Sequence, residues 1–276
     1  MRVHHLNCGT MRPLGERLLT GAGSLLRTAD LVCHCLLVET AAGLVLVDTG
    51  FGLGDVAAPA GLGRSFRRAV RPVLRESETA VRQIEALGFT AADVTDIVVT
   101  HLDLDHIGGI GDFPRARVHV YADELTAFHA RATLLERERY HRRLVAHGPD
   151  WRTYDLAGDT WHGFSSVRVL DLPDAEVALV PLVGHTRGHC GVAVRTPAGW
   201  LLHAGDAYFA QSEVTDGTAP VGLRVFQTLM QVDGRARHEN QARLRELVGS
   251  SPEVTVFCAH DRATFERLAA QVKLPG

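Results

Sequence analysis

The sequence has no long apolar run, no broad excess of basic residues and few cysteines, and each absence argues against a class of protein. No apolar stretch approaches the roughly 20 residues of a membrane-spanning helix, so we expect no membrane association. The net charge of -3 leaves no basic surface for phosphates, which argues against nucleic-acid binding. The N-terminal residues lack the apolar core of a signal peptide, which predicts a cytoplasmic protein.

The cysteines are too few and too scattered for a disulfide framework. There are five, an odd number, at positions 8, 33, 35, 190 and 258. Alternation along a strand predicts that Cys33 and Cys35 face one side as small core residues. A hydrophobic content of 46% over 276 residues is ordinary for a globular protein, and we expect one domain over residues 1–276.

One short segment carries a dense set of metal-binding side chains. His101, Asp103, Asp105 and His106 fall within six residues, directly after an apolar run that ends at Val99. Imidazole and carboxylate are ligands of divalent cations such as zinc, iron and manganese. A strand that stops and turns at this point, with two glycines following, can direct all four side chains toward one place.

The apolar runs predict an α/β fold without strict alternation of strands and helices. Clusters of strands separated by helices, in two halves, favour two mixed sheets packed face to face with helices outside, an αββα sandwich. The expected strands are Leu31–Glu39, Leu44–Asp48, Asp96–Thr100, Arg117–Tyr121, Val167–Leu170, Glu176–Val180, Val192–Arg195, Trp200–His203 and Val254–Cys258. The expected helices are Glu78–Leu87, Ala122–Ala146, Arg237–Val248 and Arg262–Val272. Residues 52–78 are the least regular and read as a mobile loop that, with residues 205–235, shapes a pocket.

Four further segments place polar groups directly after a strand. Asp48-Thr49-Gly50 follows the second strand, and Gly184-His185-Thr186, Gly205-Asp206 and Ala259-His260-Asp261 follow later ones. Strand ends at one edge of a sandwich can converge on a single cleft.

Together with His101–His106, these motifs resemble those of the metallo-β-lactamase superfamily, in the same order along nearly the whole chain. The resemblance implies two cations, zinc being expected and iron or manganese being alternatives. The first would be bound by His101, Asp103 and His185, the second by Asp105, His106 and His260, with Asp206 bridging. His189 and Asp48 would orient the ligands by hydrogen bonding.

Asp103 departs from the family pattern, because most hydrolytic members have histidine there. A third carboxylate makes the cluster less positive, so it should be a weaker Lewis acid and more tolerant of iron or manganese. Flavodiiron proteins carry glutamate at this position. Direct ligation by Asp103 and an indirect contact both remain open.

The resemblance implies hydrolysis of a carbonyl ester, with a lactone favoured as substrate, by a hydroxide shared between the cations. Asp105 would accept or relay the proton, and Tyr208 would bind the substrate carbonyl or would simply be packed in the core. The alternatives are a diiron oxidoreductase or oxygenase of the same fold and a thioester hydrolase resembling glyoxalase II. The partner would be a small molecule, and a homodimer is possible.

Several other side chains are more simply explained by surface or packing roles. A basic run from Arg64 to Arg75 favours a solvated surface over an anion-binding rim. Histidines 4, 5, 119, 129, 141 and 147 show no ligand pattern, so surface or capping roles are expected. Five aromatic side chains fit either an apolar substrate pocket or core packing; these are Phe51, Trp161, Phe164, Phe209 and Phe226.

Overall fold

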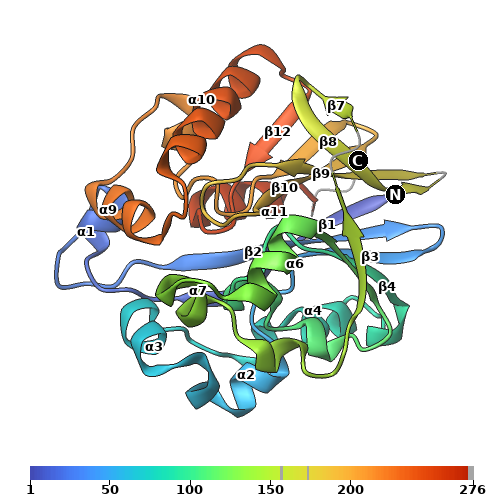
Figure 1. Cartoon of the computed structure of the whole chain (residues 1–276), viewed down its shortest axis with the longest axis horizontal. Helices are drawn as coiled ribbons and strands as arrows, with labels where there is room; N and C mark the ends of the chain where they lie inside the picture. Colours follow the sequence, from blue (N-terminus) through green and yellow to red (C-terminus); the bar gives the residue numbers. More distant parts are fainter. Residues whose placement is uncertain (156–157, 173, 273–276) are drawn as a thin grey trace.

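The computed structural model, which describes residues 1–155, 158–172 and 174–272, shows two sheets packed face to face with helices on the outer face of each (Figure 1). Each sheet has six strands. The αββα arrangement predicted from the sequence is confirmed. Among the described residues, no helix is long and apolar enough to cross a membrane.

The first sheet is built in chain order from the N-terminal half. Its first three strands pair antiparallel with their neighbours, and the third to the sixth pair in parallel. The strands are β1 (Arg2–Met11), β2 (Leu31–Thr40), β3 (Gly43–Val47), β4 (Val94–Val98), β5 (Arg117–Tyr121) and β6 (Asp150–Tyr154).

The second sheet comes from the C-terminal half and runs in the order β12-β11-β10-β9-β8-β7. All neighbours are antiparallel except β11 and β12, which are parallel. The strands are β7 (Asp159–Trp161), β8 (Phe164–Leu172), β9 (Ala175–Pro181), β10 (Cys190–Thr196), β11 (Gly199–His203) and β12 (Val254–Phe257).

Alternation along β2 shows how the layers are made. Leu36 and Val38 point between the sheets, where they pack with Val192 and other strand residues of the second sheet. Cys33 and Cys35 point the other way, into the apolar layer under the helices of the N-terminal half. The cysteines therefore share one face, as predicted, because successive strand residues face opposite sides.

The helices are more numerous than predicted. Residues 52–78, expected to be irregular, contain α2 (Leu53–Ala57), η1 (Pro59–Leu62), α3 (Arg64–Val70) and η2 (Glu76–Glu78). The other helical segments are α1 (Glu16–Thr20), α4 (Ala80–Ala86), η3 (Ala91–Asp93), α5 (Leu104–Ile107), η4 (Ile110–Asp112), α6 (Ala122–Ala130), α7 (Leu134–Arg139), η5 (Arg142–Val145), α8 (Ser212–Thr215), α9 (Val221–Met230), α10 (Gly234–Ser250) and α11 (Arg262–Val272).

The single helix predicted over Ala122–Ala146 is wrong. Arg131 ends α6 in a left-handed conformation, with φ of 45°. Thr133 then begins α7 by accepting a hydrogen bond from the Glu136 amide, while the Glu136 carboxylate accepts one from the Thr133 amide. The break matters because it turns the last residue of α7, Arg139, toward the candidate site.

Three of the histidines read as surface or capping residues have specific partners instead. His5 hydrogen-bonds His34 across β1 and β2, with 2.8 Å between Nδ1 and Nε2. His119 is buried between Asp96 and Tyr154, and His4 contacts Glu39. β1 carries His4 and His5 but was not among the expected strands, and neither were β6 and β7.

Candidate metal centre

The carboxylate of Asp206 lies at the centre of a ring of imidazoles. Its oxygens are 3.1 Å from Nε2 of His260, 3.3 Å from Nε2 of His106, 3.4 Å from Nε2 of His185 and 3.9 Å from Nε2 of His101. All five side chains are buried. Imidazole nitrogens and carboxylate oxygens therefore converge on one small volume.

The strand ends create this convergence. β4 leads to His101 and Asp103, and the short helix α5 carries Asp105 and His106. Residues that follow β9, β11 and β12 complete the cluster with His185, Asp206 and His260 respectively. The first four side chains come from the N-terminal half of the chain and the last three from the C-terminal half.

The ligand atoms fall into groups close enough to share a cation. One group contains His101, Asp103, His185 and Asp206, and its ligand atoms all lie within 4.8 Å of one another. A second contains His106, Asp206 and His260, and a third joins Asp105 and His260 to Cys33. The structure thus brings together every residue that the sequence predicted as a metal ligand, and adds a cysteine.

Asp48 holds His106 and the start of the motif loop. Its carboxylate accepts hydrogen bonds from the Thr100 amide and hydroxyl, both at 2.7 Å, and contacts Nδ1 of His106 at 2.8 Å. Asp48 has a φ of 55°, so the turn after β3 adopts a left-handed conformation to aim this side chain. Because Nδ1 of His106 is engaged, its Nε2 is left for a ligand role.

His189 and His260 are oriented in a similar way. Nε2 of His189 accepts a hydrogen bond from the Asp206 amide at 2.9 Å, and its Nδ1 donates one to the Leu182 carbonyl. Nδ1 of His260 donates to the Val32 carbonyl at 2.7 Å, which turns its Nε2 toward Asp206. The positioning role predicted for His189 thus has a matching hydrogen bond to the Asp206 backbone.

Arg139 is a site residue that the sequence reasoning missed. Its Nη1 lies 3.1 Å from Oδ2 of Asp103, and it also donates to the carbonyls of His185 and Met230. The side chain is buried. From the sequence, a charged helix is expected to be exposed to solvent. Only the capping pattern at Thr133, which divides the predicted helix, could have indicated that Arg139 lies at a helix end.

Glu124, also missed, ties together the two loops that carry the ligands. Its buried carboxylate accepts hydrogen bonds from the Leu102 amide, the Thr186 hydroxyl, the Gly188 amide and the Tyr140 hydroxyl, at 2.7 to 3.1 Å. A buried carboxylate with four donors fixes the loops firmly.

Tyr208 is fully buried in the apolar layer outside the second sheet. Its hydroxyl donates to Gln211 at 3.1 Å, and among the described residues no hydrogen bond joins it to the ligand cluster. Packing in the core, one of the two alternatives predicted for Tyr208, accounts for these surroundings.

The charges of the cluster depend strongly on one another. Burial opposes ionisation of Asp206, but His260 and His106 outweigh it and hold its pKa well below the usual range. Burial likewise opposes ionisation of Asp103, and Arg139 and His101 keep its pKa well below normal. In contrast, burial raises the pKa of Asp105, which has no arginine partner among the described residues.

Several buried polar atoms in the cluster have no hydrogen-bond partner within the described part of the chain. They are Nε2 of His101, Nε2 of His106, Oδ1 of Asp103 and Oδ1 of Asp206. Leaving such atoms buried without partners costs free energy, and cations bound among them would satisfy these atoms. The donor set therefore fits divalent metal ions, with nitrogen and oxygen ligands that suit zinc, iron or manganese.

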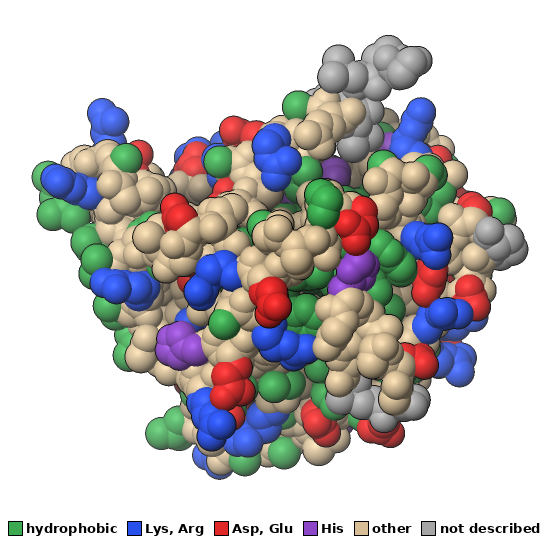
Figure 2. All heavy atoms as spheres, turned by 90° about the horizontal axis from the view of Figure 1, so that it is seen from above, with side chains coloured by type: hydrophobic (Ala, Val, Ile, Leu, Met, Phe, Trp, Pro, Cys, Tyr) green, Lys and Arg blue, Asp and Glu red, His purple; other side chains and the backbone are tan. Residues whose placement is uncertain are grey.

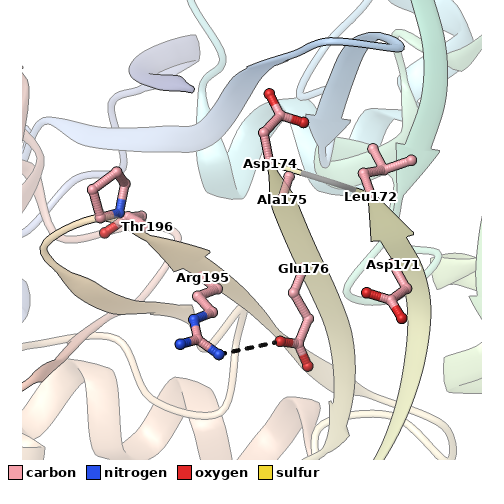
Figure 3. Close-up of a pocket in the computed structure, with 8 residues that line it drawn as sticks. Asp171, Leu172, Asp174, Ala175, Glu176, Arg195 and Thr196 are labelled. Atoms are coloured by element: carbon pink, nitrogen blue, oxygen red, sulfur yellow. Dashed lines mark ion pairs between the residues drawn. The ribbon is translucent and has the colours of Figure 1, made fainter.

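A shallow hollow elsewhere on the surface is distinct from this cluster. It lies where β8, β9 and β10 meet, and Arg195 faces Glu176 across it at 3.7 Å (Figure 3). It adjoins the first residues of β9, whereas His185 follows the last residues of that strand. The hollow is therefore at the opposite end of the strand from the ligands.

Comparison with known proteins decides the family. The model of the metallo-beta-lactamase superfamily matches residues 28–260, which include all the clustered ligands. The chain belongs to this superfamily. The resemblance drawn from the motifs is confirmed, with Asp103 standing at the second position of the histidine motif.

Relatives within the superfamily are metallo-hydrolases and lactonases. The chain is 46% identical to the "Probable metallo-hydrolase Rv2300c" of Mycobacterium tuberculosis, over 95% of this chain and 80% of that one. It is 30% identical to the N-acyl homoserine lactonase AttM of Agrobacterium fabrum, over 71% and 72% of the two chains. The superfamily and the first of these relatives support a metal-dependent hydrolase.

Solved structures show the same fold. A structure of an N-acyl homoserine lactone hydrolase with N-hexanoyl-L-homoserine at its catalytic metal centre superposes with a TM-score of 0.73. The identity is 22%, and the alignment covers 96% of this chain and 95% of the other. The likeness confirms the αββα fold at nearly full length.

Proposed function

We propose that this chain is a dinuclear metal hydrolase that opens a carbonyl ester, with a lactone as the favoured substrate. The observation that carries the proposal is the buried Asp206 carboxylate with four imidazole Nε2 atoms within 3.9 Å. Cations bound there would lower the pKa of water and polarise a carbonyl oxygen. The kinship with AttM, named an N-acyl homoserine lactonase, supports a lactone rather than another ester.

Asp105 is placed to handle the proton in this proposal. It is half-buried, while the other clustered ligands are buried, so it borders the side from which a substrate can approach. Burial raises the pKa of Asp105 in the metal-free protein, and in the proposal its carboxylate would accept or relay the proton of the attacking water. Its Oδ2 lies 3.7 Å from Nε2 of His260, and this neighbouring ring helps to hold it at the cluster.

An apolar surface leads away from the cluster. Phe209 stacks on His260 with ring centroids 5.3 Å apart, and Phe226 of α9 meets Phe209 edge-on at 5.4 Å. On α9 the side chains of Val225 and Leu229 are also exposed, and hydrophobic groups appear at the left edge of Figure 2, the side on which both α1 and α9 lie in Figure 1. This arrangement suits a lactone with an apolar substituent.

A diiron oxidoreductase is the alternative that Asp103 suggests, because Asp103 adds a third carboxylate to the ligands. Arg139 offsets that carboxylate at 3.1 Å, so the extra negative charge is largely neutralised by the protein itself. The extra negative charge of Asp103 therefore gives little support to redox chemistry, and we propose hydrolysis.

The test combines metal analysis with a substrate panel. Natively purified protein should contain two divalent ions per chain and should hydrolyse at least one member of a panel of lactones, esters and thioesters. Asp206→Asn should lose bound metal and lower kcat/KM by at least about 100-fold, because the carboxylate that would hold both cations is gone. Asp216→Asn, at an exposed position, is the matched control.

Three results would overturn the proposal. Metal-loaded protein inert toward the whole panel would exclude this kind of hydrolase. Activity confined to thioesters would replace the lactone by the thioester alternative. Oxygen consumption by an iron-loaded protein that hydrolyses nothing would instead favour the oxidoreductase.

A further inference from the structure

We propose that the thiol sulfur of Cys33 is a ligand of the second cation, alongside Asp105 and His260. This inference rests on the candidate metal centre and does not depend on the identity of the substrate. It gives the second cation site a sulfur ligand that the first site does not have.

The geometry places Cys33 within the ligand cluster. Its Sγ and the ligand atoms of Asp105 and His260 all lie within 4.8 Å of one another. The side chain is only 2% exposed, and no hydrogen bond from its sulfur is present among the described residues. A free buried sulfur that faces a carboxylate and an imidazole has the partners of a zinc site.

The backbone on both sides of Cys33 is tied to the loop that carries His260. The Val32 carbonyl accepts a hydrogen bond from Nδ1 of His260 at 2.7 Å. The His34 amide donates to the Ala259 carbonyl at 2.9 Å. These two bonds flank Cys33, so the sulfur and the imidazole of His260 are held in a fixed relation without a bound ion.

The Cys33 amide donates to the side chain of Asn7, which fixes the strand from the β1 side as well. The position of the thiol is therefore determined by neighbouring backbone contacts rather than by apolar packing alone.

Coordination would proceed by loss of the thiol proton to solvent as the sulfur–metal bond forms. An unperturbed cysteine thiol is mostly protonated at pH 7, so the sulfur has to lose a proton when the bond to the metal forms. Binding at this site should consequently release a proton that a serine variant does not release.

The two sites would then differ in the metals that they prefer. The first site gains the hard carboxylate of Asp103, which suits manganese or iron, while the second gains a soft thiolate, which suits zinc. Loading with a mixture of zinc and manganese should place the ions unequally.

Cys35 provides the matched control. It lies two residues along the same strand, faces the same side and is equally buried, but it belongs to none of the ligand groups. A change at Cys35 disturbs packing in the same layer without touching the candidate ligand.

Cobalt substitution of the full-length protein tests the inference without any assay of turnover. Loaded with Co²⁺, the unaltered protein should show a near-ultraviolet sulfur-to-cobalt charge-transfer band. Cys33→Ser should lose that band while it keeps the visible cobalt bands, and Cys35→Ser should retain all of them. Titration with Zn²⁺ should release one proton fewer in Cys33→Ser than in Cys35→Ser.

The inference is overturned if cobalt-loaded unaltered protein shows visible cobalt bands but no sulfur band, or if Cys33→Ser keeps the sulfur band. If Cys33→Ser does not fold, single serine variants of Cys8, Cys35, Cys190 and Cys258 decide the assignment. A band that survives in all four comes from Cys33, whereas its loss in any one of them assigns the ligand elsewhere. A centre that binds no cobalt at all would refute the metal site itself, which the visible bands report separately.

Discussion

The guanidinium of Arg139 lies 3.1 Å from the carboxylate of Asp103, and both side chains are buried. Asp103 stands where most hydrolytic members of the superfamily have a histidine. The arginine supplies a positive charge that offsets the negative charge brought by the aspartate. The departure from the motif is therefore paired with a compensating residue, contributed by a helix far from the motif in sequence.

Replacing Arg139 by glutamine should show how far the buried charge of Asp103 depends on this arginine. Asp103 would be left as a buried charge without its partner, so the metal-free protein should lose about 3 kcal/mol of unfolding free energy. A bound cation can take over the role of the guanidinium, and part of the loss should be recovered with metal. Urea unfolding in the presence of EDTA and of excess zinc measures both values.

Arg143→Gln is the control for that experiment, because Arg143 pairs with buried Asp55 away from the cluster. Its effect on stability should be the same with and without metal. If Arg139→Gln shows equal losses in both conditions, Arg139 acts only through the carbonyls of His185 and Met230.

Restoring the common motif by Asp103→His should be harmful alone and tolerated together with Arg139→Gln. An imidazole facing the buried guanidinium leaves Arg139 without its counter-ion, whereas the double change removes both members of the pair. We expect a coupling of about 2 kcal/mol in a double-mutant cycle of unfolding free energies. Additive effects of the two changes would contradict a direct interaction.

Glu124→Gln should loosen the ligand loops. The carboxylate accepts four hydrogen bonds, and an amide would present N–H groups to some of the same donors. We expect a loss of about 2 kcal/mol in unfolding free energy and weaker metal binding by calorimetry. Glu138→Gln, at an exposed position, should change neither value. Full metal affinity in Glu124→Gln would mean that the loops hold their shape by other contacts.

The His5–His34 pair predicts a loss of stability in mild acid. Burial, and then His203, lower the pKa of His5 to about 4, below the value near 6.5 of an unfolded chain. Between these values the unfolded state binds the proton and the folded state does not, so stability falls as the pH drops through this range. At pH 5 the linkage costs about 2 kcal/mol relative to pH 7.5.

Urea unfolding at pH 7.5 and pH 5 measures this loss. In His5→Gln the decrease between the two pH values should be smaller, since one titrating group is gone. His129→Gln alters an exposed histidine and should leave the decrease unchanged. An identical decrease in the unaltered protein and in His5→Gln would assign the acid sensitivity to other groups.

Much of the architecture could be predicted from the sequence because strand ends carried the ligand motifs. His101, His185, Asp206 and His260 each follow an apolar run, and the structure gathers the three imidazoles around the Asp206 carboxylate. The local sequence pattern was sufficient to predict these features, since each strand and each motif consists of consecutive residues.

The parts that were missed depend on contacts between distant segments. Arg139 and Glu124 belong to charged helical stretches that look solvated, and only the packing of α6 and α7 against the motif loops buries them. The strand pattern predicts Cys33 as a core residue, and its face of β2 supports this, but its nearness to His260 comes from hydrogen bonds between segments 227 positions apart in sequence. Residues 52–78 looked irregular because their helices are short.

The cluster draws on both halves of the chain. His101, Asp103, Asp105 and His106 belong to the half that builds the first sheet, and His185, Asp206 and His260 to the half that builds the second. A fragment containing either sheet alone would hold an incomplete coordination shell. Cations bound by ligands from both halves would link the two sheets. Removal of the cations by a chelator should therefore weaken the packing of one sheet against the other, and not only the order of the ligand side chains.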